Sequence, residues 1–130
     1  MIKPFAFALM TIHAVAGAAL AEEIAVTHAQ GETVLQAVPQ SVMVTDWAAF
    51  DILTALGVPV EGVPASVAPG HLADKVTDEM QRIGSLQEPD IEGIAAAAPD
   101  LVIIGGRSRT SYGTISRLAP VIDISVTAGR

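Results

Sequence analysis

Two arginines and a tyrosine, Arg107, Arg109 and Tyr112, stand close together after the pair Gly105-Gly106. Arginine suits an anionic ligand because its charge is fixed and its planar guanidinium donates several hydrogen bonds to oxygen atoms. The spacing of Arg109 and Tyr112 from Arg107 allows them to contact the same ligand, but it equally allows either one to face solvent. This loop is therefore our candidate binding site.

The residues before the loop predict the elements that position it. Leu101–Ile104 has no polar alternation, which is typical of a strand covered on both faces in a parallel sheet. A short amphipathic helix, capped by Asp90 and stopped by Pro99, precedes that strand. Gly105-Gly106 then allows a sharp turn at the carboxyl end of the strand. Because ligands of open α/β sheets bind at this edge, the sequence predicts a cationic loop where a ligand would lie.

Trp47 occupies an equivalent position after an earlier strand. Ser41–Thr45 is a short apolar strand, Asp46 caps a helix over Trp47–Leu56, and Gly57 ends it. The tryptophan in the first turn of this helix either packs in the core or lines the ligand cleft.

The remaining chain predicts an α/β fold: a Rossmann-like, mostly parallel sheet flanked by helices and preceded by a short β-hairpin. We expect, in order, a hairpin over Ile24–Val38 with the three-residue loop Gln30–Glu32, a parallel strand near Val58–Val63, a helix over Gly70–Met80 with Leu72 and Val76 facing inward, a minimal strand at Arg82-Ile83, a helix over Ser111–Leu118 and a last strand at Val121–Ile124.

Several kinds of chemistry are excluded or disfavoured. The chain has no cysteine, so disulfides and thiolate metal sites are impossible. His28 has no partner at metal-ligand spacing, and we expect no metal site. A nucleotide-dependent enzyme would need a G-x-G-x-x-G turn after the first strand, and a hydrolase would need a nucleophile with its base; neither is present. We expect a protein that is not an enzyme.

The first 21 residues are expected to form a cleavable signal peptide. Lys3 gives a positive start, an apolar run follows, and Ala19-Leu20-Ala21 precedes Glu22 as an A-x-A cleavage site. The alternative is a membrane anchor, but the run is short for a bilayer span. We therefore expect a mature protein in the periplasm that is not embedded in the membrane.

The charge of the mature chain is unevenly distributed. Without residues 1–21 it keeps six basic and 14 acidic residues, a net charge of −8. Four of the six basic residues follow position 100, where Asp123 is the one acidic residue. The acidic body argues against a nucleic-acid partner, whereas the local basic patch favours an anionic ligand.

The order of these motifs resembles the amino-terminal lobe of the periplasmic ferric-siderophore-binding proteins of ABC importers, especially the catecholate-type members of class III. The resembling segments are VMVTDWAAFDILTALG (42–57), VEGVP (60–64), IGSLQEPDIEGIAAAAPDLVIIGGR (83–107) and RLAPVIDISV (117–126). The resemblance implies two α/β lobes joined by one long helix, with the ligand held between them. It also implies a monomer that delivers its ligand to an inner-membrane permease.

The resemblance gives two residues a role. Arg107 occupies the position of the family arginine that contacts the siderophore; the alternative is a solvated loop arginine. Glu92 matches the glutamate with which the amino-terminal lobe docks onto arginines of the permease; the alternative is an ordinary exposed helix glutamate.

The sequence also departs from the family pattern. The connecting helix and the second lobe are missing, so we expect residues 22–130 to form one lobe of a truncated chain or fragment. A haem or cobalamin carrier of the same fold, a non-functional fragment and a stand-alone interaction module remain the alternatives.

Overall fold

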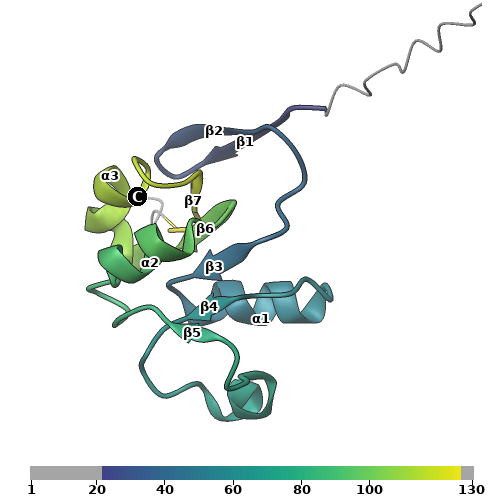
Figure 1. Ribbon diagram of the computed structural model, residues 1–130, viewed down its shortest axis with the longest axis vertical. Coiled ribbons are helices and arrows are strands. Elements are labelled where there is room, and N and C mark those ends of the chain that lie inside the picture. Colours follow the sequence, from purple (N-terminus) through teal and green to yellow (C-terminus); the bar gives the residue numbers. More distant parts are fainter. Residues whose placement is uncertain (1–21, 127–130) are drawn as a thin grey trace, which may run out of the picture.

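The computed structural model describes residues 22–126, and its centre is a five-stranded parallel sheet with the strand order β5-β4-β3-β6-β7 (Figure 1). The expected signal peptide lies outside the described residues. The sheet strands are β3 (Val42–Val44), β4 (Gly62–Val63), β5 (Gln81–Arg82), β6 (Leu101–Ile104) and β7 (Val121–Asp123). They alternate along the chain with the helices α1 (Trp47–Ala55), α2 (Ile91–Ala97) and α3 (Tyr112–Ile115) and the 3₁₀ helices η1 (Gly70–Lys75) and η2 (Gly106–Ser111). The predicted α/β class is confirmed.

The two faces of the sheet are covered by different helices, because successive strand residues point to opposite faces. Val42 and Val44 of β3 pack in one cluster with Trp47 and Phe50 of α1. The residue between these valines, Met43, packs on the other face, in a cluster with residues of α2 and α3. Burial on both faces explains why β3 and β6 lack polar alternation.

The helix boundaries follow the predicted capping residues. Asp46 accepts hydrogen bonds from the amides of Ala48 (2.8 Å) and Ala49 (3.3 Å) at the start of α1. Asp90 accepts the amide of Gly93 (3.0 Å) at the start of α2. Each carboxylate satisfies amides that have no partner within the helix, so both helices begin where the sequence indicated.

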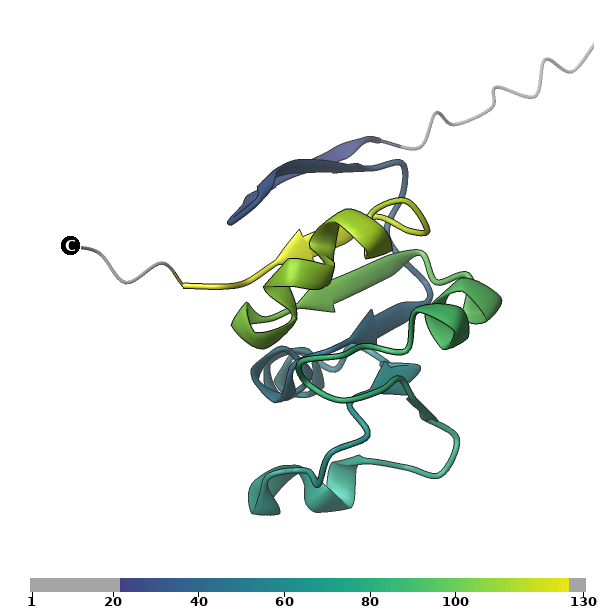
Figure 2. The same cartoon turned by 90° about the vertical axis from the view of Figure 1, so that its left-hand side faces the viewer.

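An antiparallel hairpin of β1 (Ile24–His28) and β2 (Gly31–Leu35) covers the free edge of β7 (Figures 1 and 2). The Thr33 hydroxyl donates to the carbonyl of Val121 (2.6 Å), and the Ala29 amide donates to the carbonyl of Asp123 (3.1 Å). These bonds satisfy edge carbonyls that would otherwise be open to another strand.

Three details of the sequence prediction were wrong. The hairpin loop has two residues, Ala29 and Gln30, because His28 pairs directly with Gly31. The helix expected over residues 70–80 is only the 3₁₀ segment η1. Leu72 is buried and Val76 packs partly buried against the core, as expected, but the backbone is extended at Val76, because one short apolar stripe does not sustain a helix. The helix expected over residues 111–118 is only the four-residue α3, since Ser111 still belongs to η2 and α3 ends at Ile115.

The parallel strands all run in one direction, so their carboxyl ends meet at one edge of the sheet (Figure 2). The loops after β3, β4, β5, β6 and β7 gather there. We call this side, where the sequence predicts a ligand, the ligand edge.

A cationic loop anchored at the ligand edge

Gly105 begins the loop, and the reason for a glycine is steric. A Cβ atom at this position would collide with the carboxylate of Asp46, the N-cap of α1. The carboxyl end of β6 therefore lies directly against the start of α1. The loop that follows is the 3₁₀ helix η2, which carries Arg107 and Arg109.

A buried chain of hydroxyl groups anchors this loop. The Ser108 hydroxyl donates to the carbonyl of Leu86 (2.7 Å), so it accepts from the hydroxyl of Thr45, 2.8 Å away. Ser108 is 0% exposed and Thr45 is 2% exposed. The chain joins the loops after β3, β5 and β6, and because Ser108 points inward, its two neighbours are left on the outside.

Arg107 and Arg109 are both exposed beside this anchor. Neither forms an ion pair with another residue of segment 22–126. An exposed guanidinium that no carboxylate contacts within residues 22–126 is available to an anion that approaches from solvent. The structure therefore places both predicted arginines at the ligand edge, on one rigidly held loop.

Tyr112 is the first residue of α3 and is half-buried. Its ring centroid lies 5.8 Å from that of His28, with the planes tilted by 54°. The His28 ring is itself fully bonded: Nδ1 accepts the amide of Gln30 (3.2 Å), and Nε2 donates to Thr33 (2.8 Å). His28 thus holds the side of Tyr112, and with both nitrogens in use it has a structural role.

The structure places Trp47 in the core. Its side chain is buried, packs edge-to-face on Phe50 with centroids 5.7 Å apart, and donates its indole N–H to Ser66 Oγ (3.0 Å). Of the two predicted alternatives, the core and the ligand cleft, the structure shows the core position. A contact with ligand through its remaining exposed edge stays a prediction.

Glu92 lies apart from the arginine loop, in the first turn of α2. Its carboxylate is exposed and forms no ion pair within residues 22–126. The position leaves Glu92 available to a partner, and its role in docking stays a prediction.

Asp123 is a residue of this edge that the sequence reasoning did not select. It ends β7 opposite Ile104 and is 1% exposed. Burial alone would raise the pKa of this carboxyl, but hydrogen bonds from the side chain and amide of Ser125, a bond from Gln30 and the nearby charge of Arg109 hold the pKa below its ordinary value. The signal in the sequence was its position as the one acidic residue after position 100.

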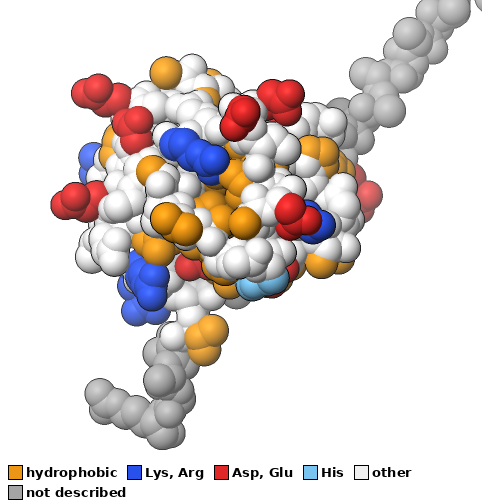
Figure 3. Space-filling view, turned by 90° about the horizontal axis from the view of Figure 1, so that it is seen from below, with side chains coloured by type: hydrophobic (Ala, Val, Ile, Leu, Met, Phe, Trp, Pro, Cys, Tyr) orange, Lys and Arg blue, Asp and Glu red, His pale blue; other side chains and the backbone are white. Residues whose placement is uncertain are grey.

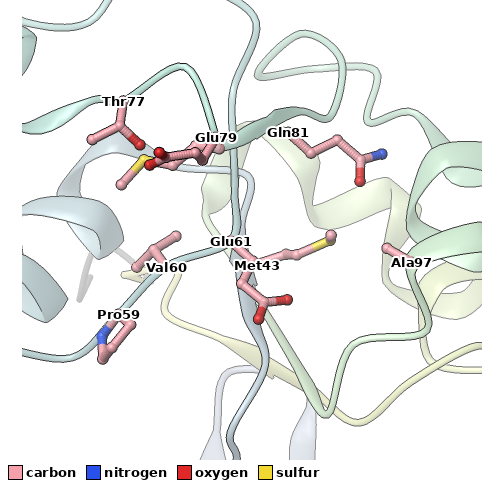
Figure 4. Close-up of a pocket in the computed structure, with 9 residues that line it drawn as sticks. Met43, Pro59, Val60, Glu61, Thr77, Glu79, Gln81 and Ala97 are labelled. Atoms are coloured by element: carbon pink, nitrogen blue, oxygen red, sulfur yellow. The ribbon is translucent and has the colours of Figure 1, made fainter.

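Other hollows lie away from the arginine loop. One of about 520 Å³ is lined by residues that include Glu61, Glu79 and Gln81 (Figure 4). Another, of about 320 Å³, is formed by Ala65–Ala68 with Ala73, Val76 and Arg82. Figure 3 shows apolar side chains at the centre of one face, with basic side chains at more than one place around them. No group of three potential metal ligands (His, Cys, Asp or Glu) occurs in the part of the chain that the structure describes.

The model of the periplasmic binding protein family matches residues 42–128, which include the whole parallel sheet and the arginine loop. This chain belongs to that family. Some of the proteins that it resembles are named as ABC transporter substrate-binding proteins.

Three relatives illustrate the similarity. The petrobactin-binding protein YclQ of Bacillus subtilis is 37% identical over 94 residues, which are 71% of this chain and 30% of YclQ. The siderophore-binding protein BauB, solved with two acinetobactin molecules and ferric iron, is 34% identical with a TM-score of 0.76, covering 82% of this chain and 38% of BauB. The catecholate-siderophore-binding protein VctP of Vibrio cholerae is 36% identical with a TM-score of 0.74, covering 78% and 37%.

The chain thus spans well under half of each of these periplasmic binding proteins. Within the described residues, no helix is both long enough and apolar enough to cross a bilayer.

Proposed function

We propose that this chain is the amino-terminal lobe of a periplasmic substrate-binding protein that captures a ferric siderophore for an ABC importer. The observation that carries the proposal is the two arginines on the Ser108-anchored loop at the ligand edge, which form no ion pair within residues 22–126. The printed names of YclQ, BauB and VctP, all siderophore-binding proteins, support the ligand class.

The chemistry of the edge fits such a ligand. A ferric tris-catecholate carries three negative charges on planar oxygen-rich groups, which a guanidinium can contact with two parallel hydrogen bonds. At about 4 Å and an effective dielectric constant near 20, each such charge pair contributes roughly 4 kcal/mol before desolvation. Arg107 is the primary contact in this proposal, and Arg109 and Tyr112 line the same surface.

The proposal includes a place and a partner. The protein acts in the periplasm after removal of residues 1–21, as a monomer. Exposed Glu92 on α2 docks onto the inner-membrane permease. One lobe provides only part of the contacts in this scheme, since the ligand lies between two lobes, and we expect residues 22–130 alone to bind weakly.

The test is a titration of residues 22–130, followed by amide NMR, with gallium(III) tris-catecholate, a diamagnetic complex with the charge of the ferric one. We expect weak binding, with the largest shifts confined to Gly105–Tyr112. Haem and cyanocobalamin are titrated in parallel. Stronger shifts at the same residues with either of these would replace the siderophore with that ligand, and shifts centred on Glu61 and Glu79 would contradict the proposed edge.

A further inference from the structure

A single buried carboxylate stands behind the arginine loop. Asp123 ends β7 and pairs in register with Ile104, the residue immediately before Gly105. Among the described residues after position 100, it is the one acidic group, against Arg107, Arg109 and Arg117. Its side chain is 1% exposed, so solvent does not screen it directly.

The hydrogen bonds around Asp123 keep its carboxylate ionised. One carboxylate oxygen accepts the amide (2.8 Å) and the hydroxyl of Ser125, and the other accepts the side-chain amide of Gln30 (2.9 Å). Hydrogen bonds to a carboxylate favour its ionised form. The lowered pKa, which these bonds produce against the effect of burial, agrees with a charge that persists at neutral pH.

The carboxylate is also electrically linked to the loop. Arg109 contributes to the lowered pKa of Asp123, although no ion pair joins the two within residues 22–126. The interaction is mutual, so Asp123 acts on Arg109 to the same extent. Ser125, which holds the carboxylate, lies against the loop: a Cβ on Gly106 would be 3.7 Å from its hydroxyl.

We propose that Asp123 is a specificity-determining residue that offsets one of the two loop arginines and so limits the negative charge that this edge accepts in a ligand. The proposal rests on the proposed function, because it assumes that the ligand approaches Arg107 and Arg109. A buried negative charge near an anion site opposes binding in proportion to the charge of the anion. A neutral ligand would not be affected.

The first experiment needs no ligand and therefore remains decisive if the proposed function fails. Relaxation of the Gly106 and Arg107 amides is measured with the cosolutes carboxy-PROXYL and aminomethyl-PROXYL, whose ratio reports the local electrostatic potential. Asp123→Asn should make this potential more positive. Asp100→Asn is the matched control: that carboxylate accepts the amides of Gln40 (2.9 Å) and Ser41 (3.1 Å) at the opposite edge, and its loss should leave the potential at Gly106 unchanged.

A second pair of variants separates charge from hydrogen bonding. Gln30→Ala removes a donor to Asp123 but keeps the charge, so the potential at Gly106 should stay as in the parent. If Asp123→Asn does not fold, Arg109→Gln replaces it: loss of the guanidinium should raise the pKa of the Asp123 carboxyl, which carboxyl NMR follows, because the two groups are coupled. An unchanged pKa of Asp123 in Arg109→Gln, or a potential at Gly106 that does not rise in Asp123→Asn, would overturn the proposal.

The last experiment tests the consequence for ligand choice. Gallium(III) tris-catecholate, with three negative charges, is compared with a neutral gallium(III) tris-hydroxamate. Asp123→Asn should strengthen binding of the trianion by about three- to thirtyfold and leave the neutral complex unchanged. Equal changes for both complexes would show that Asp123 acts only through structure. If neither complex binds, the proposed function fails and the potential measurement alone decides the role of Asp123.

Discussion

The hydroxyls of Thr45 and Ser108 lie 2.8 Å apart in the interior, although 63 residues separate them in the chain. This contact ties the end of β3 to the arginine loop after β6. It fixes which residues of the loop face inward and which face solvent, and the properties of the ligand edge depend on it.

Replacing Ser108 with alanine should destabilise the protein and loosen the loop. The change leaves the hydroxyl of Thr45 and the carbonyl of Leu86 without this partner in the interior, which typically costs about 1–3 kcal/mol per buried group. Urea unfolding, followed by the fluorescence of Trp47, measures the loss. Ser116→Ala is the control, since its hydroxyl donates to Gly113 on the exposed surface (3.3 Å), and it should change stability little. Equal stability of the two variants would show that the buried chain is not structurally important.

Arg107→Ala should weaken ligand binding in a two-lobed carrier that contains this lobe. A charge-assisted hydrogen bond to a desolvated anion is worth about 1.5–3 kcal/mol, which corresponds to a loss of about ten- to more than a hundredfold in affinity. Arg107→Lys should restore only part of it, because the ammonium lacks the planar fork of the guanidinium. Ferric-siderophore titration measures these affinities. Arg117→Ala removes the same charge from another exposed position and is the control. An equal loss of affinity in Arg117→Ala would show that Arg107 acts only through its charge and not by direct contact with the ligand.

Glu92→Ala should leave ligand affinity unchanged and lower the rate of iron uptake. The residue is exposed on α2 and lies outside the arginine loop, so its loss affects docking and not capture. Ligand titration and a cellular uptake assay are performed on the same variant. Glu79→Ala, at the hollow of Figure 4, is a matched loss of one exposed carboxylate. If Glu92→Ala loses affinity instead, the ligand edge has been assigned to the wrong side of the lobe.

Asp123 should make stability depend on acid pH. Its folded-state pKa lies below the ordinary value of 3.8, so the ionised carboxylate stabilises the fold fully above that value. This contribution is lost as the pH falls from the ordinary value through the lowered one. The difference in unfolding free energy between the parent and Asp123→Asn should therefore be largest near neutral pH and shrink below about pH 4. A difference that does not vary with pH would contradict this assignment.

The mature protein should begin at Glu22. Export through a cleavable signal peptide predicts that periplasmic fractions contain a chain without residues 1–21, which N-terminal sequencing of the isolated protein checks. Recovery of Met1 in the inner-membrane fraction would instead identify residues 1–21 as an anchor.

Local patterns predicted the elements that carry the ligand edge. Asp46 and Asp90 cap their helices as expected, because an N-cap bonds to amides two or three residues away and needs no distant partner. Leu101–Ile104 was recognisable as a buried strand because both of its faces are covered. The prediction of a helix over residues 70–80 was wrong because local pattern alone was not enough there. A polar segment with two apolar positions has little tertiary packing to hold it helical, and only one 3₁₀ segment formed.

Contacts between residues far apart in the chain could not be predicted from the sequence. Ser108 is a small polar residue between two arginines, and nothing local indicates that it is fully buried on Thr45. The partner of Asp123 at Gln30 lies 93 residues away, across the whole domain. Such pairings depend on the strand order, which places β7 beside the hairpin, and the order follows only from the complete sheet.

The hairpin of β1 and β2, which covers the edge of β7, has a consequence for the order of folding. The hairpin is local, since β1 and β2 are joined by two residues, so its pairing needs no residue outside 24–35. Its contacts to β7 close loops of 88 and 93 residues and therefore involve nearly the whole of residues 24–123. Contacts of high sequence separation form slowly, because the loop entropy is lost before the contact is gained. An isolated hairpin is marginally stable in water, so we expect β1 and β2 to become stable only on attachment to β7, and this attachment to be among the last steps that complete the fold.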